Sequence, residues 1–218
     1  MVLDQILERI EQARLSFGRH HIVQLVAVSK AVDTDAVAAL YAQGQRAFGE
    51  NRVQELERKS RLLADLPLAW HMIGRIQENK INKLIDLAPV LIHSIDSFKT
   101  AQAFHKRLEL KNRFQFALLQ INAAREASKQ GVLPEEALEL YERIRHECPR
   151  LLLQGVMTIG AHSDDQALIA KSFETTRRIF EQIGDASICS MGMSGDFELA
   201  IACGSTMVRI GSLLFSKF

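Results

Sequence analysis

The amino-acid sequence predicts an α/β protein, a single-domain (β/α)8 TIM barrel spanning residues 1–218. Eight short apolar segments alternate with segments long enough to be helices. Because parallel strands need a crossover connection between them, this alternation predicts a parallel sheet. Eight such units favour a closed barrel, and a doubly wound open sheet is the alternative architecture. No proline-rich or low-complexity linker interrupts the chain, so we expect one domain.

The first segment, residues 1–18, is predicted to be an amphipathic helix. Leu3, Ile6, Leu7 and Ile10 share one face at helical spacing. Charged residues among them argue against a signal-peptide core or a membrane span, both of which need an uninterrupted apolar run. The last predicted strand has almost no helix after it, and this first helix is available to cover that gap.

The other elements follow in regular order. Residues 24–30 are the first predicted strand, and Asp33 or Thr34 caps a helix that runs to residue 42. The later strand and helix pairs are predicted at 46–50 and 51–64, 69–74 and 77–87, 90–95 and 97–110, 114–122 and 134–147, 151–160 and 164–182, and 187–193 and 195–203, with a last strand at 206–211.

Charge and cysteine content limit the classes of partner. The 27 Lys and Arg residues nearly balance the 26 Asp and Glu residues, for a net charge of +1, so we expect no nucleic-acid or membrane partner. Cys148, Cys189 and Cys203 lie far apart, without the close pairs of a zinc site or the density of a disulfide scaffold. We therefore predict no metal site and a reducing, cytoplasmic environment.

Lys30 ends the first predicted strand, at the end of the barrel where active sites form. Val26, Val28 and Lys30 alternate onto one strand face, so the lysine shares that face with two residues expected inside the barrel. We expect its amine to be partly desolvated, which favours the neutral form that attacks an aldehyde. The alternative is a lysine that extends from the strand end into solvent.

A second candidate is the turn between residues 190 and 204, where Ser194 is predicted to be the N-cap of a helix and Gly195 lies just inside it. A helix start with a serine hydroxyl suits an anion, and barrels often bind phosphate between the loops after strands 7 and 8. The alternative is an ordinary serine cap.

A third candidate lies on the last strand. If Val208 and Ile210 face the surrounding helices, Arg209 must point into the barrel, where a buried guanidinium needs a partner. Gly211 and Ser212 then supply a backbone that allows close approach and a second hydroxyl. The alternative is a structural arginine paired with a carboxylate such as Glu50. Together, a strand-end lysine, an anion cup and an inward arginine suit a phosphorylated aromatic aldehyde.

At these residues the sequence resembles the YggS/PROSC family of pyridoxal-phosphate-binding homeostasis proteins, whose fold is the alanine racemase N-terminal barrel (PLP fold type III). The resemblance covers essentially the whole chain. It rests on VAVSK (26–30), FGENRVQE (48–55), WHMIGRIQENK (70–80), QINAAREASKQG (120–131), GVMTIG (155–160) and SMGMSGDFELAIACGSTMVRIG (190–211).

The resemblance implies a set of residues that bind pyridoxal 5′-phosphate, with no catalytic residue assigned. Lys30 would carry the cofactor as a Schiff base, and Arg209 would face the pyridine nitrogen. A cation there keeps the nitrogen unprotonated and weakens the electron sink that carbanion chemistry needs. Asn51 and Ile73 would contact the ring region of the cofactor. The phosphate would be held by Ser194, Gly211 and Ser212.

Some positions depart from the family pattern, and others match it without a clear role. Arg52 stands where tyrosine is common, Arg75 and Glu78 vary the loop after the third strand, and Ser212 replaces a frequent threonine. We interpret Arg52 and Arg75 as surface residues. His71 and His93 are expected to be hydrogen-bonded core or rim residues. Lys129 is interpreted as a solvated loop lysine, with the attraction of incoming cofactor phosphate as the alternative.

Three functions are compatible with these residues. The family resemblance implies a non-catalytic carrier, which we expect to be a monomer that buffers pyridoxal phosphate and delivers it to apo-enzymes. An amino-acid racemase or decarboxylase would need a second acid or base opposite the lysine, but Tyr41 and Tyr141 both fall in predicted helices. Such enzymes also carry an additional β-domain. A Schiff-base aldolase would leave the inward Arg209 without a clear role.

Overall fold

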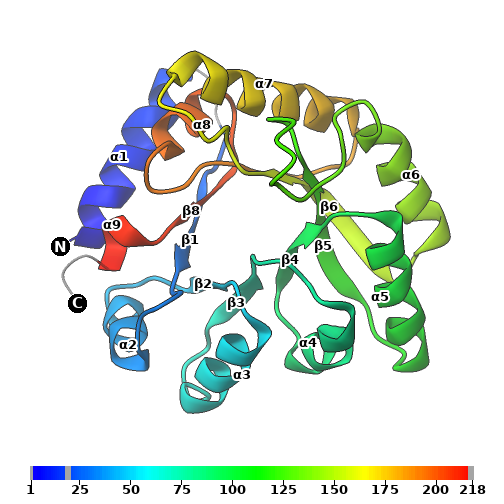
Figure 1. Cartoon of the computed structure of the whole chain (residues 1–218). Helices are drawn as coiled ribbons and strands as arrows, with labels where there is room; N and C mark the ends of the chain where they lie inside the picture. Colours follow the sequence, from blue (N-terminus) through cyan, green and yellow to red (C-terminus); the bar gives the residue numbers. More distant parts are fainter. Residues whose placement is uncertain (1, 18–20, 216–218) are drawn as a thin grey trace.

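The computed structural model describes residues 2–17 and 21–215, and its strands form a closed parallel barrel in chain order (Figure 1). The predicted fold class is therefore confirmed, and the open sheet is excluded. The strands are β1 (Gln24–Val28), β2 (Ala47–Glu50), β3 (Ala69–Met72), β4 (Leu91–Ile95), β5 (Gln115–Ile121), β6 (Leu151–Thr158), β7 (Ile188–Ser190) and β8 (Met207–Ile210).

A layer of helices surrounds these strands (Figure 1). Its members are α1 (Val2–Ser16), α2 (Thr34–Ala42), α3 (Val53–Leu62), the 3-10 helix η1 (Glu78–Lys80), α4 (Ile81–Leu87), α5 (Phe98–Leu110), α6 (Ala137–Glu147), α7 (Gln166–Gln182), α8 (Phe197–Ala202) and α9 (Ser212–Phe215). One begins at a predicted cap. Asp33, rather than Thr34, caps α2 by accepting a hydrogen bond from the Ala36 amide at 2.9 Å.

The barrel closes where β1 pairs with β8 on one side and with β2 on the other. Val26 lies opposite Arg209 in the β1–β8 register. All strands end within a few residues of the predicted bounds, but β1 ends at Val28, two residues before Lys30. Lys30 therefore belongs to the loop after β1 and not to the strand itself.

Two apolar clusters form the core. The larger one fills the space between the strands and the helices and includes Val208 and Ile210. The smaller one consists of side chains from the strands that alternate with these and therefore face the barrel interior. Its buried members are Val26, Leu91, Leu118, Met157 and Met207. The predicted inward face of β1 is thus confirmed at Val26.

Helix α1 covers the place in the outer layer that α9, the four-residue helix after β8, is too short to fill. It lies beside α8 and α9 (Figure 1) and buries Leu3, Ile6 and Ile10. Leu7, predicted on the same face, is 45% exposed and is not among the buried residues of α1. Positions 1 and 18 of the predicted helix lie outside the described residues.

Within the described residues, no helix is long and apolar enough to cross a membrane. The same part of the chain contains no group of three or more His, Cys, Asp or Glu side chains arranged to hold a metal ion. Cys148, Cys189 and Cys203 are free thiols.

Candidate cofactor-binding site

The predicted site residues gather at one end of the barrel. Lys30 follows β1, Asn51 follows β2 and Ile73 follows β3, while Ser194 lies after β7 and Gly211 after β8. Because all strands run parallel around a closed barrel, their carboxyl ends share one rim. Arg209, on β8 itself, faces the interior below that rim.

Lys30 lies at a tight turn. The Val32 amide donates a hydrogen bond to Ser29 O at 3.2 Å, which places Lys30 and Ala31 at the two corners. Ala31 has a φ of +64°, in the left-handed region that costs an L-residue about 1 kcal/mol or more. Lys30 is exposed, so the expected partial desolvation of its amine was wrong. The turn thus places Lys30 beyond the end of β1, where it is exposed.

A buried ion pair between Lys59 and Glu50 contacts the first residue of this turn, Ser29. Lys59, on α3, donates to Glu50 Oε1 and to Ser29 O, both at 2.6 Å. Ser29 Oγ also donates to Glu50 Oε1 at 2.6 Å. Lys59, Glu50 and Ser29 are all fully buried. The residue before Lys30 is therefore fixed through both its backbone carbonyl and its side chain.

The loops after β2 and β3 touch each other at the rim. A Cβ on Gly74 would lie only 2.1 Å from Asn51 O, so the two backbones are in direct contact there. The Ile73 amide donates to Glu50 O at 2.9 Å, and the Ile73 side chain packs beside Gly49. Asn51 is exposed and Ile73 is partly buried, as suits residues that line an open mouth.

Arg52 and Arg75 are exposed, as predicted for surface residues. Both nevertheless line a cleft of about 790 Å³ that also includes Asn51 and Lys80. The added positive charge therefore lies directly beside the mouth of the barrel.

Ser194 and Gly211, predicted as parts of one anion cup, are in contact. The Gly211 amide donates to Ser194 Oγ at 3.2 Å. Ser194 is not a helix cap, because α8 begins at Phe197 with Asp196 in the cap position, and that prediction was wrong. The chain forms a turn over residues 194–196 instead, which leaves the Ser194 hydroxyl directed to Gly211. Ser212 is exposed and opens α9.

Gly211 also lies against the first strand. A Cβ at this position would be 3.0 Å from Val28 O, so a side chain here would press on the strand that leads to Lys30. The backbone of Gly211 thus joins the Ser194 loop to the Lys30 loop.

Arg209 points into the barrel, as predicted, and is 4% exposed. Its guanidinium donates to Ser190 Oγ at 2.6 Å and to Thr158 O at 2.9 Å. Burial lowers the pKa of Arg209 to about 10, while the nearby Asp196 carboxylate acts in the opposite direction, so the group is cationic at neutral pH. Glu50, suggested from the sequence as its possible partner, pairs with Lys59 instead.

His71 and His93 are core residues that face one another inside the barrel. His71 Nδ1 and His93 Nε2 are 2.9 Å apart. Burial lowers the pKa of His71 to about 4 and that of His93 well below its ordinary value, so both rings are neutral at neutral pH. The interpretation of both residues as hydrogen-bonded core histidines is confirmed.

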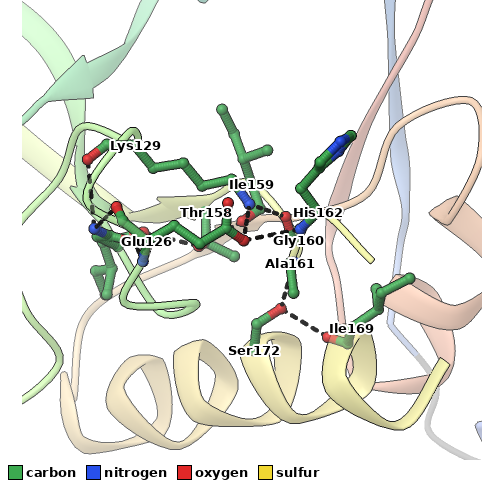
Figure 2. Close-up of polar contacts among 11 residues, drawn as sticks. Glu126, Lys129, Thr158, Ile159, Gly160, Ala161, His162, Ile169 and Ser172 are labelled. Atoms are coloured by element: carbon green, nitrogen blue, oxygen red, sulfur yellow. Dashed lines mark hydrogen bonds and ion pairs between the residues drawn. The ribbon is translucent and has the colours of Figure 1, made fainter. Parts of the chain in front are cut away.

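Lys129 is neither flexible nor solvated, which corrects the sequence-based interpretation. Its amine donates to Glu126 Oε1 at 2.8 Å and to Gly160 O at 2.6 Å, and its side chain is only 15% exposed. Figure 2 shows Glu126 between Lys129 and the His162 backbone, whose amide donates to the same carboxylate oxygen at 2.8 Å. This contact ties the loop after β5 to the loop after β6.

Sequence reasoning missed the residues that support the site from below. Lys59 was not singled out, although Val53, Leu56 and Lys59 recur at a spacing of three and all three are buried on one face of α3. A lysine in that apolar stripe signals a buried partner. Ser190 and Thr158 gave no such signal, because a short polar residue near a strand end is ordinary.

Comparison with known proteins agrees with this geometry. Residues 2–217 match the family described as alanine racemase, N-terminal domain. The pyridoxal phosphate homeostasis protein of Helicobacter pylori (strain J99) is 55% identical over 215 residues, which cover 99% of this chain and 97% of that protein. The chain belongs to the pyridoxal phosphate homeostasis protein family.

Two solved structures have the same fold as this chain. A protein of unknown function from Bifidobacterium adolescentis has a TM-score of 0.90 and 34% identity, covering 98% of this chain and 93% of that one. PipY of Synechococcus elongatus, solved with PLP bound, has a TM-score of 0.81 and 32% identity, covering 94% of this chain and 99% of that one.

Proposed function

We propose that this chain binds pyridoxal 5′-phosphate on Lys30 and keeps it in reserve for the cell, without efficient turnover of amino acids. The observation that carries the proposal is the shared rim: an exposed lysine, the Ser194–Gly211 contact and a buried cation all lie at the same barrel end. A family relative solved with PLP bound, PipY, supports the choice of cofactor.

The residues present fit this cofactor. The Gly211 amide and the Ser194 hydroxyl meet at one point of the rim. Backbone amides and hydroxyls of this kind bind phosphate. Ser190 Oγ and Thr158 O, which accept hydrogen bonds from Arg209, are neutral, so neither cancels the positive charge that a ring nitrogen would face.

Bound pyridoxal phosphate supplies an aldehyde, a pyridine ring and a phosphate. The neutral amine of Lys30 bonds to the aldehyde carbon, and the aldehyde oxygen leaves as water with the two amine protons. Arg209, as a cation, keeps a facing ring nitrogen unprotonated, so electron withdrawal by the ring is weak. The chain thus binds the aldehyde without favouring loss of a proton from a bound amino acid.

The alternative, a racemase, needs a second base opposite Lys30. Tyr141 lies in α6 and is 1% exposed, and burial raises its pKa, which disfavours the phenolate. Tyr41 lies in α2, where its ring packs under Arg46 at 4.1 Å. Neither tyrosine is at the rim, which supports the carrier function.

The test is the visible absorption of the purified protein, followed by borohydride reduction and mass spectrometry. We expect a reduced cofactor adduct on Lys30 in the wild-type protein. Lys30→Arg keeps the charge but should carry none, while Lys99→Ala, which changes a lysine whose side chain is 86% exposed, should leave the adduct unchanged. A wild-type protein that stays colourless in excess cofactor refutes the proposal.

Delivery is the second half of the proposal. We propose transfer to PLP-dependent apo-enzymes in a reducing cytoplasm, consistent with the three free thiols. The assay mixes the loaded protein with a defined apo-enzyme and follows the recovery of its activity, against an equal concentration of free cofactor. In parallel, chiral analysis after incubation with single L-amino acids distinguishes a carrier from a racemase, and turnover at ordinary enzyme rates would favour the racemase.

A further inference from the structure

A continuous chain of hydrogen bonds crosses the barrel interior beneath the site. Arg209 donates to Ser190 Oγ at 2.6 Å, Ser190 Oγ lies 3.3 Å from His93 Nδ1, and His93 Nε2 lies 2.9 Å from His71 Nδ1. The participating residues come from β8, β7, β4 and β3. Their exposed fractions are 4%, 0%, 0% and 5%, so water does not compete for these contacts.

In this chain of hydrogen bonds, the donors and acceptors can be ordered in only one direction. A guanidinium has donors and no acceptor, so Arg209 must donate to Ser190 Oγ. Within the described part of the protein, Ser190 Oγ has two partners, Arg209 and His93. Its own proton therefore goes to His93 Nδ1, since any other arrangement leaves a buried hydroxyl donor unsatisfied.

The direction then fixes the histidine tautomers. His93 accepts at Nδ1, so its proton is on Nε2, and it donates to His71 Nδ1. His71 in turn carries its proton on Nε2. Both rings are neutral, as their burial requires. A protonated His71 Nδ1 would place a donor against the His93 donor and break the chain.

We propose that His71, His93 and Ser190 are positioning residues that hold the Arg209 guanidinium in one orientation through this one-directional chain. Thr158 O fixes a second nitrogen at 2.9 Å, so two of the guanidinium nitrogens are held. The neutral partners add no negative charge, unlike a carboxylate, and leave Arg209 its full cationic character. The link to the cofactor ring rests on the proposed function above, whereas the direction of the chain does not.

The first test needs no cofactor. Long-range proton–nitrogen correlation spectra of the full-length protein at neutral pH report which ring nitrogen carries the proton in each histidine. We expect both His71 and His93 as the Nε2–H tautomer. A His93 protonated on Nδ1, or an imidazolium at neutral pH, would overturn the direction of the chain and with it the proposal.

The second test uses matched variants of His93. Asparagine places its amide near the position of Nδ1, so His93→Asn keeps a partner for Ser190, whereas His93→Gln places its amide near Nε2 and loses that partner. We expect Ser190→Ala and His93→Gln to shift the visible spectrum of bound cofactor and to weaken its affinity about tenfold, the size of one hydrogen bond. His93→Asn should resemble the wild-type protein.

These outcomes separate this inference from the proposed function. If the wild-type protein carries no Lys30 adduct, the proposed function fails while the tautomer measurement still decides the direction of the chain. If the wild-type protein binds cofactor and all three variants retain its spectrum and affinity, the proposed function stands and the positioning role is refuted.

Discussion

Among single residues, Lys59 and Glu50 have the most costly environment. Both side chains are fully buried; Glu50 Oε1 accepts from Lys59 and Ser29, whereas Glu50 Oε2 has no hydrogen-bond partner among the described residues. Removing two charges from water costs several kcal/mol each, and only close pairing offsets this cost. The pair therefore contributes less to net stability than its 2.6 Å contact suggests. Removing one partner, however, leaves the other charge buried without a counter-ion. Its position behind the Ser29–Val32 turn makes the pair a support for Lys30.

We expect Lys59→Met to lower the free energy of unfolding by about 3–5 kcal/mol, because Glu50 would remain as an uncompensated buried carboxylate. Urea unfolding followed by circular dichroism measures the change. The double variant Lys59→Met/Glu50→Gln should recover part of the loss. On the same helix, Arg58→Met removes an exposed ion pair with Glu55 and should cost less than about 1 kcal/mol. Equal losses at positions 58 and 59 would contradict this account.

The histidine pair gives stability a pH dependence. The pKa of His71 in the folded protein is lowered to about 4, and that of His93 is lowered as well, by burial first and then by His71 and Arg209. Between pH 6.5, the ordinary value, and pH 4 the unfolded chain binds protons that the folded protein refuses. The stabilisation is therefore complete above pH 6.5 and is lost as the pH falls.

We expect the unfolding free energy to fall by up to about 1.4 kcal/mol per pH unit for each histidine over this acid range. Urea midpoints measured at pH 7, 6 and 5 follow the change. A His71→Gln variant should show a shallower slope than the wild-type protein, because it no longer takes up a proton on unfolding. An unchanged slope in this variant would assign the acid sensitivity to other groups.

At the scale of elements, β6 contains an irregularity that its sequence only hints at. Gly155 has a φ of +145°, and a Cβ there would lie 2.0 Å from Ile188 O on β7. The register between β5 and β6 shifts nearby, between Ala117 and Leu119. The glycine lets β6 approach β7 while β6 changes its register against β5.

We expect Gly155→Ala to cost more than about 3 kcal/mol, because backbone strain and a collision with a strand carbonyl act together. Gly44→Ala provides the comparison: its φ is +108°, but nothing lies within 4 Å of the added Cβ. This control should cost only about 1 kcal/mol from strain alone. Thermal unfolding of both variants measures the difference, and similar losses would show that the close contact with Ile188 is unimportant.

The alternation of apolar and helical segments was enough to predict all eight strands, because each βα unit repeats the same pattern. The ends of elements were less predictable. Ser194 looks like a helix cap in sequence, yet Gly211, distant along the chain, takes its hydroxyl. Lys129 looks like a solvated loop lysine in sequence, yet its amine donates a hydrogen bond to Gly160 O in the loop after β6. Such long-range contacts leave no local signal.

For the molecule as a whole, the proposed site lies at the barrel rim, and a layer of helices surrounds the strands. Helix α1 completes that layer beside α8, where Arg9 makes a two-point contact with Glu198 at 2.9 and 3.0 Å. No strand edge is left open in the closed barrel, so no edge is available for pairing with a second chain.

We therefore expect the protein to be a monomer. Light scattering coupled to size-exclusion chromatography, with and without cofactor, should give the mass of one chain over a wide concentration range. A mass of two chains that persists on dilution would contradict the expectation and would point to the exposed helical surface as an interface.

The place of α1 also bears on how the protein is made. Its partners α8 and α9 follow it in the chain after most of the strands, so a growing chain presents α1 long before these contacts can form. Until then, Leu3, Ile6 and Ile10 have no permanent cover. The outer layer is thus completed by a segment made before its partners, and the apolar face of α1 is what a nascent-chain chaperone would meet.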